Sequence, residues 1–455
     1  MHHPGLSPRE GLLYGGLGLP LAFVALPLYV FLPNHYARAF GLPLATLGTL
    51  LLTARLLDAF IDPWLGRLSD RLFARSIRSV LATGAVAALV LATGFAGLFF
   101  PPVRAHPGLL AWAAVLLVLT YGAYSLLSIT HQAWGAGLGG DEVQRSRVVA
   151  WREGLGLVGV VAAAMAPTLL GLPATAALFS VALALGWLAW TRAPRPLRPT
   201  GARPGHAPRL PPPVPATRHA SVWRPLTLPA FRRLLTVFVV NGIASAIPAT
   251  LVLFFVQDRL QAPPALEPAF LGVYFVSAAL SLPLWMRAVR RWGLARTWLA
   301  GMLLAVAVFA WAATLGAGDA RAFLLVCALS GVALGTDLAL PGAILAGVIA
   351  AQGDHGQAEG TYFGWWNFAV KLNLALAAGL ALPLLALAGY TPGTRDPHAL
   401  QALTLAYCAL PCALKLLAGG LLFTQIIRPT AAPSPSPSPS PSPSPSASPP
   451  LRSTP

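Results

Sequence analysis

The chain has 455 residues, of which 56% are hydrophobic and only 10% are charged. Soluble proteins carry about 25% charged residues, so this composition excludes an ordinary soluble protein and predicts a polytopic membrane protein. The net charge of +17 comes almost entirely from arginine. These arginines lie between apolar stretches, without the interleaved stacking aromatics of single-strand binders, so we do not expect nucleic acid as a partner.

Apolar stretches close to the ~20 residues that a helix needs to cross a bilayer recur along the whole chain. We predict an all-α polytopic membrane protein with twelve transmembrane helices in two six-helix bundles. The first six predicted helices cover residues 11–33, 43–67, 79–100, 108–134, 150–170 and 173–191. The second six cover residues 233–256, 266–287, 297–316, 321–350, 360–390 and 399–426.

The composition changes between and after these two sets. Residues 1–191 form the first predicted bundle, and residues 233–427 form the second. Residues 192–232 are rich in arginine and proline, which predicts a semi-extended cytoplasmic linker. Residues 428–455 contain the run "PSPSPSPSPS", which cannot bury apolar surface and predicts a disordered tail. The end of the eighth predicted helix faintly repeats the end of the second. Such a repeat favours two parallel halves with a solute site between them.

Loop charges predict the orientation in the membrane. Arginines concentrate in the loops after the second, fourth, sixth and eighth predicted helices, and the opposite loops carry few. Positive charge stays in the cytoplasm, so we predict both termini inside and a bacterial-type inner membrane location. The first apolar run continues to about Phe31 and is interpreted as a helix, not as a cleaved signal peptide. The three cysteines lack metal-ligand spacing, so we expect no resident cofactor.

Two aspartates lie within the second predicted helix, in "ARLLDAFIDPWLGRLSDR". Asp58 and Asp62 are four residues apart, so their side chains share one helical face. A carboxylate at the bilayer centre costs roughly 2.5–3.5 kcal/mol, and two neighbouring carboxylates also repel each other. A bound cation or a shared proton relieves both penalties, so the pair predicts a cation-binding site. The alternative is that Asp62, directly before Pro63, is simply hydrated near the cytoplasmic end.

A lysine lies deep in the eleventh predicted helix, within "FGWWNFAVKLNLALAAGL". Lys371 is too far from the helix start to reach the membrane surface, so it needs a carboxylate or an aqueous cavity. Asp58 and Asp62 are the expected partners, and Asp337 of the tenth predicted helix is another candidate. Arg55 precedes Asp58 by three residues and would complete the network. The alternative is a static structural ion pair.

Polar and aromatic residues mark the fourth predicted helix and the start of the fifth. A hydroxylated solute needs hydrogen bonds and a stacking face, which such a helix can supply. These residues could equally bond only to neighbouring helices. The solute-binding candidates here are Tyr124, Ser128, Gln132, Trp134 and Arg152.

The turn "GRLSDR" follows the second predicted helix. This turn contains Gly66, Asp70 and Arg71. We predict that it is an interdomain latch, whose contacts break when the two bundles move relative to each other. The alternative is a solvated loop. The sequence contains no P-loop, HExxH or GxSxG motif. We therefore expect neither an enzyme nor an ATP-driven pump.

Several of these segments resemble one family. "ARLLDAFIDPWLGRLSDR", "DEVQRSRVVAWRE" and the stretch from "GTDLALPGAILAG" to "YFGWWNFAVKLNLALAAG" resemble the glycoside–pentoside–hexuronide:cation symporters, the melibiose-permease branch of the major facilitator superfamily. The resemblance implies alternating access driven by Na+, H+ or Li+. It implies that Asp58 and Asp62 bind the cation near Lys371. It also implies that Ser125 supplies a hydroxyl ligand and that Arg152 contacts a sugar.

The chain also departs from the melibiose permease. Ile61 stands where that permease has Asn, which weakens the case for sodium and leaves protons attractive. Gly18 and Ser128 stand where it has galactoside-binding aspartates, which argues against galactosides. We expect a monomeric symporter in the lipid bilayer, coupled to H+ or Na+ and carrying a small solute, a sugar or glycoside. The alternatives are a carrier or exporter of an amphiphilic, lysolipid-like or drug-like solute, and a membrane scaffold or sensor that transports nothing.

Overall fold

The computed structural model describes residues 6–196 and 221–431. These residues form helices and loops, with no strand in the described part. The first half contains α1 (Pro8–Gly15), α2 (Gly18–Leu26), α3 (Leu32–Phe40), α4 (Leu44–Arg75), α5 (Ile77–Phe99), α6 (His106–Gly137) and α7 (Glu142–Thr191). The second half contains α8 (Arg224–Thr227), α9 (Pro229–Phe254), α10 (Glu267–Trp292), α11 (Leu294–Ala312), α12 (Ala320–Ala351), α13 (Glu359–Leu387), α14 (Pro397–Thr404), α15 (Leu410–Leu422) and α16 (Arg428–Ala431). Short π-helical turns continue α2, α9, α14 and α15.

Eight helical stretches of the described residues are long and apolar enough to cross a membrane. The longest, α7, is broken at Gly171, whose φ of 77° and ψ of 165° are not helical. Glycine adopts this conformation readily, and Pro173 removes a backbone donor just beyond it. The break coincides with the predicted boundary between the fifth and sixth helices. The all-α polytopic architecture is therefore confirmed, whereas the count of twelve stays a prediction.

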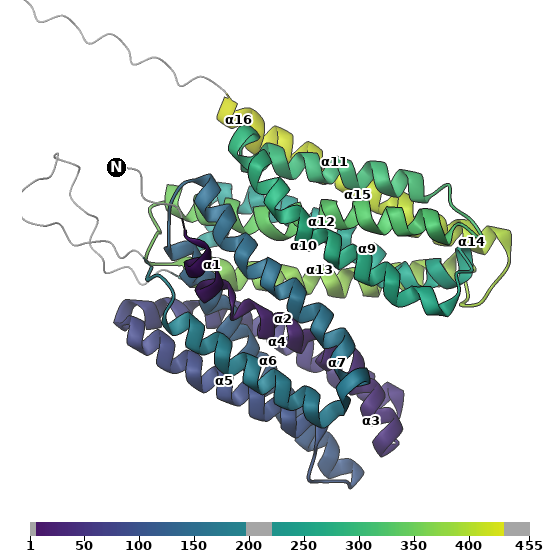
Figure 1. Ribbon diagram of the computed structural model, residues 1–455, viewed down its shortest axis with the longest axis horizontal. Helices are drawn as coiled ribbons and strands as arrows, with labels where there is room; N and C mark the ends of the chain where they lie inside the picture. The colour runs from purple at the N-terminus through teal and green to yellow at the C-terminus, as the bar shows by residue number, and fades with distance from the viewer. Residues whose placement is uncertain (1–5, 197–220, 432–455) are drawn as a thin grey trace, which may run out of the picture.

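The helices gather into two groups. Figure 1 shows α1–α7 packed on one side and α9–α16 on the other, with α13 running alongside α4. Helix α7 of the first group also packs against α10 and α12 of the second. The two groups lie closest at the end that carries α1 and α16, and they diverge toward α3 and α14 (Figure 1). The predicted linker falls mostly on residues 197–220, and the predicted tail mostly on 432–455, both outside the described residues.

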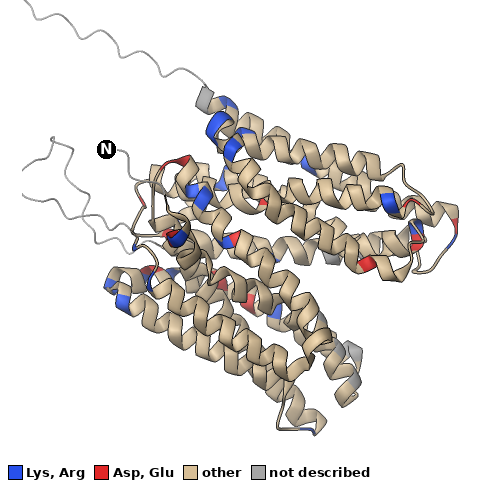
Figure 2. Ribbon diagram, viewed as in Figure 1, with Lys and Arg blue, Asp and Glu red and all other residues tan. Residues whose placement is uncertain are grey.

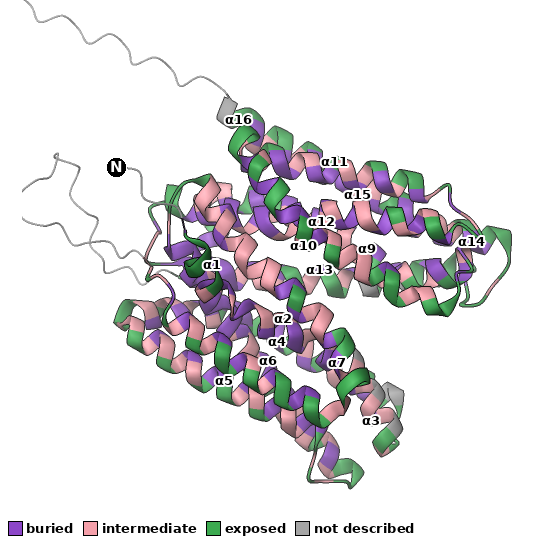
Figure 3. Ribbon diagram, viewed as in Figure 1, coloured by how far each residue is buried: buried purple, intermediate pink, exposed green. Residues whose placement is uncertain are grey.

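The surface is apolar along the helices and charged at their ends. Large hydrophobic side chains are exposed on the outer faces, among them Leu280 at 75% and Leu169 at 69%, and Figure 3 shows exposed residues on the outer faces of both groups. Lys and Arg gather mainly at the helix ends near α1 and α16, with a few charged residues along the helices (Figure 2). Such a surface suits contact with lipid, because apolar side chains lose nothing by facing hydrocarbon.

Candidate functional site

One ammonium group lies between two carboxylates where α4 meets α13. Lys371 Nζ is 2.7 Å from Asp58 Oδ2 and 2.7 Å from Asp62 Oδ2. It also donates to the hydroxyl of Ser125 at 2.7 Å, and that hydroxyl donates to Asp58 Oδ1 at 2.7 Å. Asp58 is 5% exposed and Asp62 is fully buried. With both carboxylates ionised, the three charged groups together carry a formal charge of −1.

Close helix packing brings these groups together. Asp58 and Asp62 share one face of α4, as their spacing predicts. A Cβ added to Gly364 of α13 would lie 2.6 Å from the backbone oxygen of Asp62, so only glycine lets α13 approach this closely. Lys371 follows Gly364 by about two helical turns and therefore lies on the same face of α13. The sequence thus places the lysine opposite the aspartate pair.

A strip of polar side chains continues from this group along α6. Ser125, Ser128 and Gln132 lie at helical spacing on one face. Gln132 Nε2 donates to Ser128 Oγ at 3.0 Å and to Asn367 Oδ1 of α13 at 3.3 Å. Arg152 Nη2 of α7 donates to the same serine oxygen at 3.2 Å. The strip therefore contains side chains from both helix groups.

Arg152 is held by an acidic neighbour. Its guanidinium forms an ion pair with Glu153, the next residue in α7. The Arg152 side chain is 16% exposed and the Glu153 side chain is 24% exposed, so both retain some access. The polar strip thus ends in a pair that can both donate and accept hydrogen bonds.

The other predicted residues fall around or outside this strip. Tyr124 interacts electrostatically with Arg152 and Asp58, and Arg55 interacts electrostatically with Tyr121. Trp134 is buried inside the first helix group, where its Nε1 donates to the backbone oxygen of Pro194 at 2.8 Å. Its ring packs against Phe73 and Trp190, so its burial fits a packing role.

Asp337 does not lie beside Lys371. Its carboxylate instead contacts Lys415 of α15, with Lys415 Nζ 2.9 Å from Asp337 Oδ2. The sequence alone offers Asp337 as a possible partner of Lys371, because it places a carboxylate in another apolar helix. The structure instead turns Lys371 toward the two aspartates of α4 and leaves Asp337 paired with Lys415.

Asn367 and Lys415 are among the residues with close polar contacts that the sequence patterns did not single out. Asn367 precedes Lys371 by four residues, so helical spacing alone put it on the same face of α13. Lys415 is one of only two lysines in the chain and lies in an apolar helix. The membrane argument that selected Lys371 applies equally to Lys415.

The predicted latch residues contact the second helix group. The Asp70 carboxylate accepts hydrogen bonds from the backbone N–H of Gly360 at 2.6 Å and of Thr361 at 2.8 Å, and from the Thr361 hydroxyl at 2.5 Å. A Cβ on Gly66 would lie 2.2 Å from the backbone oxygen of Gly360. Arg71 is exposed beside this contact. Asp70 thus caps the first turn of α13, whose own N-cap residue makes no side-chain cap.

A second carboxylate of the first group makes a similar contact with α11. Glu142 Oε2 accepts from the backbone N–H of Leu294 at 3.0 Å. The N-cap of α11 is Gly293, which has no side chain to cap the helix. Two helices of the second group are therefore capped by acids of the first.

A further ion pair holds the short helix α8 outside the candidate spans. Arg224 Nη2 lies 2.6 Å from Asp354 Oδ1, in the loop before α13. The hydrogen bond to Asp354 raises the pKa of the Arg224 guanidinium above its ordinary value, so the arginine is charged at every physiological pH. Tyr362 Oη also donates to Asp354, at 2.7 Å. The contact ties α8 to the start of α13.

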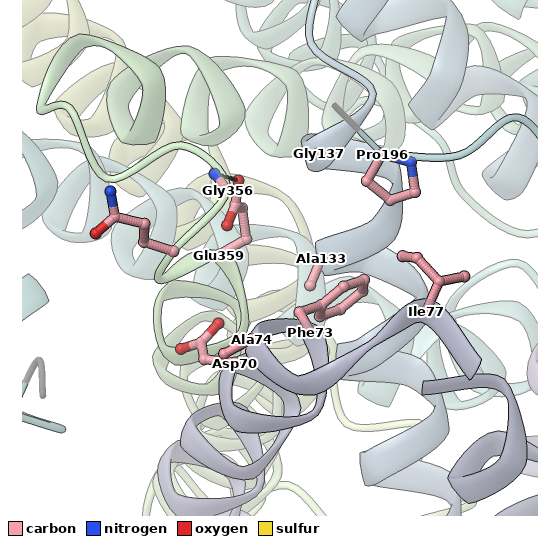
Figure 4. Close-up of a pocket in the computed structure, with 10 residues that line it drawn as sticks. Asp70, Phe73, Ala74, Ile77, Ala133, Gly137, Pro196, Gly356 and Glu359 are labelled. Atoms are coloured by element: carbon pink, nitrogen blue, oxygen red, sulfur yellow. Dashed lines mark hydrogen bonds between the residues drawn. The ribbon is translucent and has the colours of Figure 1, made fainter. Parts of the chain in front are cut away.

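A pocket of about 200 Å³ lies near the Asp70 contact. Figure 4 shows Asp70, Phe73 and Ile77 on one side and Gly356 and Glu359 on the other. None of its lining residues belongs to the group around Lys371. The pocket therefore adjoins the latch and not the buried charges.

Comparisons with known proteins identify the family. The family described as MFS/sugar transport protein matches residues 13–427. The chain is 28% identical over 161 residues to the inner membrane symporter YicJ of Escherichia coli (strain K12), covering 34% of this chain and 33% of that protein. It is 28% identical over 159 residues to the putative glycoside/cation symporter YagG of the same organism, covering 34% of each chain. The chain thus aligns with about a third of the length of these relatives.

Solved structures share the fold. A bacterial homologue of the iron transporter ferroportin in its outward-facing state matches with a TM-score of 0.65 at 14% identity, covering 92% of this chain and 99% of that chain. The fucose:proton symporter FucP of E. coli matches with a TM-score of 0.63 at 16% identity, covering 90% and 98%.

The apolar helical stretches and the fold shared with these structures define a multi-pass membrane protein. The chain belongs to the MFS/sugar transport protein family.

Proposed function

We propose that this protein is a symporter that couples a cation, H+ or Na+, to the movement of a small hydroxylated solute, a sugar or glycoside. The observation that carries the proposal is the single ammonium group of Lys371 between Asp58 and Asp62. Two carboxylates facing one ammonium retain one negative charge. A buried group in this state favours the entry of one further positive charge.

The coupling step follows from the placement of these charges. Without a bound cation, Lys371 ties α13 to both aspartates of α4. A cation that neutralises one carboxylate weakens this tie and favours a different arrangement of the bundles. The hydroxyl of Ser125 supplies a third oxygen ligand, whereas Ile61 supplies none, so a proton suits the site better than sodium.

The polar strip on α6 is the proposed solute site. Ser128, Gln132, Arg152, Glu153 and Asn367 offer hydrogen-bond donors and acceptors from both bundles. A sugar presents several hydroxyls, each able to donate and accept, and therefore matches this set. Ser128 of the strip lies one helical turn from Ser125 of the cation site, so the affinity for the solute would depend on whether a cation is bound.

The sidedness of the structure follows from the arginine-rich loops. If these loops face the cytoplasm, then both termini are cytoplasmic and the contacts of Asp70 and Glu142 close the cytoplasmic side. The described conformation is then outward-facing, and Gly66, Asp70 and Arg71 belong to the latch that opens on rocking. The names of the relatives YicJ and YagG support a location in the bacterial inner membrane and a glycoside as solute. We expect a monomer to suffice, because both bundles lie in one chain.

The test uses the purified full chain and its thermal stability. Wild type and Asp58→Asn are compared across a panel of sugars, glycosides and lysolipids, with Na+, Li+ or neither, at two pH values. We expect a sugar or glycoside to stabilise wild type more strongly with one cation or at lower pH, and to lose this dependence in Asp58→Asn. If only lysolipids stabilise the protein, the proposed solute is an amphiphile and not a sugar or glycoside. Indifference to cation and pH in both proteins would overturn the symporter proposal.

A further inference from the structure

The polar strip contains one acid and one base, and they are neighbours in α7. Glu153 forms an ion pair with Arg152, so these two side chains together carry no net charge. The other members of the strip, Ser128, Gln132 and Asn367, are uncharged. The proposed solute site is therefore neutral, whereas the group around Lys371 carries a formal charge of −1.

The guanidinium of Arg152 is occupied at both of its outer nitrogens. Nη1 donates to Glu153 Oε1, and Nη2 donates to Ser128 Oγ at 3.2 Å. The third nitrogen, Nε, is buried and makes no hydrogen bond with the described residues. A carboxylate binds an arginine best through two parallel hydrogen bonds. An acidic solute would therefore have to displace Glu153 or Ser128 to bind Arg152 in this way.

Close packing of α2 keeps the arginine in place. A Cβ added to Gly18 of α2 would lie 2.5 Å from the backbone oxygen of Arg152 and 3.2 Å from its Cγ. The backbone of α2 thus lies directly against the stem of the arginine side chain. This contact limits how far the guanidinium can turn away from Glu153 toward a solute.

Glu153 keeps one oxygen for a solute. Its Oε1 accepts from Arg152, and its Oε2 makes no hydrogen bond with the described residues. The side chain is 24% exposed, and Oε2 is not among the fully buried polar atoms. An ionised carboxylate can only accept hydrogen bonds. The hydroxyl of a neutral sugar can donate to Oε2, whereas the carboxylate of an acidic sugar has no proton to donate.

The surrounding charges also disfavour an anion. Tyr124 interacts electrostatically with Arg152 and Glu153 and with both aspartates of the cation group, so the two sets of charges surround one side chain. A solute with its own negative charge would approach a group that already has an excess of negative charge. Like charges repel more strongly in a poorly hydrated site than in water.

We propose that Glu153 restricts the solute to neutral sugars and glycosides and excludes their acidic counterparts. It occupies the guanidinium that an acidic sugar needs, and it offers an acceptor that only a hydroxyl can use. The inference rests on the proposed function, in which the polar strip is the solute site, and adds the charge of the solute to it.

The test uses sugar pairs that differ only at carbon 6, namely glucose and glucuronate, galactose and galacturonate, and the methyl glycosides of each. Each sugar is titrated against the thermal stability of the purified full chain at neutral pH and constant Na+. We expect wild type to bind the neutral member of a pair at least about tenfold more tightly than the uronate. Equal affinities would overturn this inference and leave the sugar site standing. If neither member of any pair stabilised wild type, the proposed sugar site would fall, and this inference with it.

Substitution of the acid tests its role directly. Glu153→Gln keeps the size of the side chain but frees Arg152, so the affinity for the uronate relative to its neutral partner should rise roughly 10- to 100-fold. Arg152→Gln/Glu153→Gln removes both charges and should lose this gain. Glu142→Gln makes the same change in the same helix outside the strip and should leave the ratio as in wild type.

A ratio in Glu153→Gln equal to that of wild type would overturn the role of Glu153. A rise of the same size in Glu142→Gln would also overturn it, because the gain would then follow from any lost acid of α7. If Glu153→Gln does not fold, the wild-type comparison still decides whether the site excludes acidic sugars.

Discussion

The two buried lysines occupy different electrostatic surroundings. Lys371 reaches from one bundle to the other and faces two carboxylates, so its group has a formal charge of −1. Lys415 stays within one bundle and faces one carboxylate, so its group is neutral. A negative group between the bundles can respond both to a cation and to bundle movement. A neutral, fully hydrogen-bonded group inside one bundle has no excess charge for a cation to neutralise and makes no contact that bundle movement would break.

Removing Lys415 is the strongest way to test this difference. Lys415→Met leaves Asp337 buried without a counter-charge, and breaking a buried pair in this way costs about 3–5 kcal/mol. Unfolding of the purified chain, followed by temperature or denaturant, measures the loss. Asp337→Asn/Lys415→Met should recover most of the stability, because no unpaired charge remains. A single variant as stable as wild type would show that the pair is hydrated.

Removing Lys371 should have an effect of similar size that a cation can reverse. Lys371→Met leaves Asp58 and Asp62 facing each other without a counter-charge, so we expect a loss of about 3–5 kcal/mol at low salt and neutral pH. Na+ or acid should restore much of this stability, because either can take the place of the ammonium. Lys415→Met is the matched control, since Na+ should not restore it. Equal recovery of both variants by Na+ would contradict the distinction between the two centres.

The contacts that close the bundles should have intermediate effects. Asp70→Asn replaces one oxygen of a group that accepts three hydrogen bonds at the first turn of α13, whereas Glu142→Gln affects one bond at α11. Losing a helix cap costs about 0.5–2 kcal/mol. Hydrogen exchange of the amides of Gly360 and Thr361 should therefore accelerate by roughly 2- to 30-fold in Asp70→Asn.

The same exchange measurement at Leu294 provides the comparison. Glu142→Gln should accelerate exchange there by a smaller factor, and should leave Gly360 and Thr361 unchanged. Faster exchange at both helices in either variant would mean that the two caps open together. The latch would then be one unit and not two independent contacts.

The sequence predicted the helices and the central ion group better than the partners of individual residues. Membrane length and spacing were enough to find α4, the break at Gly171 and the shared face of Asp58 and Asp62. The depth of Lys371 predicted that it needs a carboxylate. Spacing could not assign Asp337, because any long apolar helix offers a lysine several possible neighbours. The choice depends on which helices pack together, and that information lies in the tertiary contacts.

The smallest expected effects distinguish residues of the proposed solute site from residues that only pack in the core. Gln132→Ala removes one hydrogen-bonding side chain from the proposed solute site, which is worth about 0.5–1.5 kcal/mol or roughly 2- to 12-fold in solute affinity. Trp134→Phe also removes one hydrogen bond, but that bond joins α6 to Pro194 inside the first bundle. It should lower stability by about 1 kcal/mol and leave solute affinity unchanged. The stability and the solute affinity of each variant are obtained from one titration of the purified chain, in which solute concentration is varied and thermal stability is measured. An affinity loss in Trp134→Phe equal to that in Gln132→Ala would place the solute against the tryptophan and move the site off the strip.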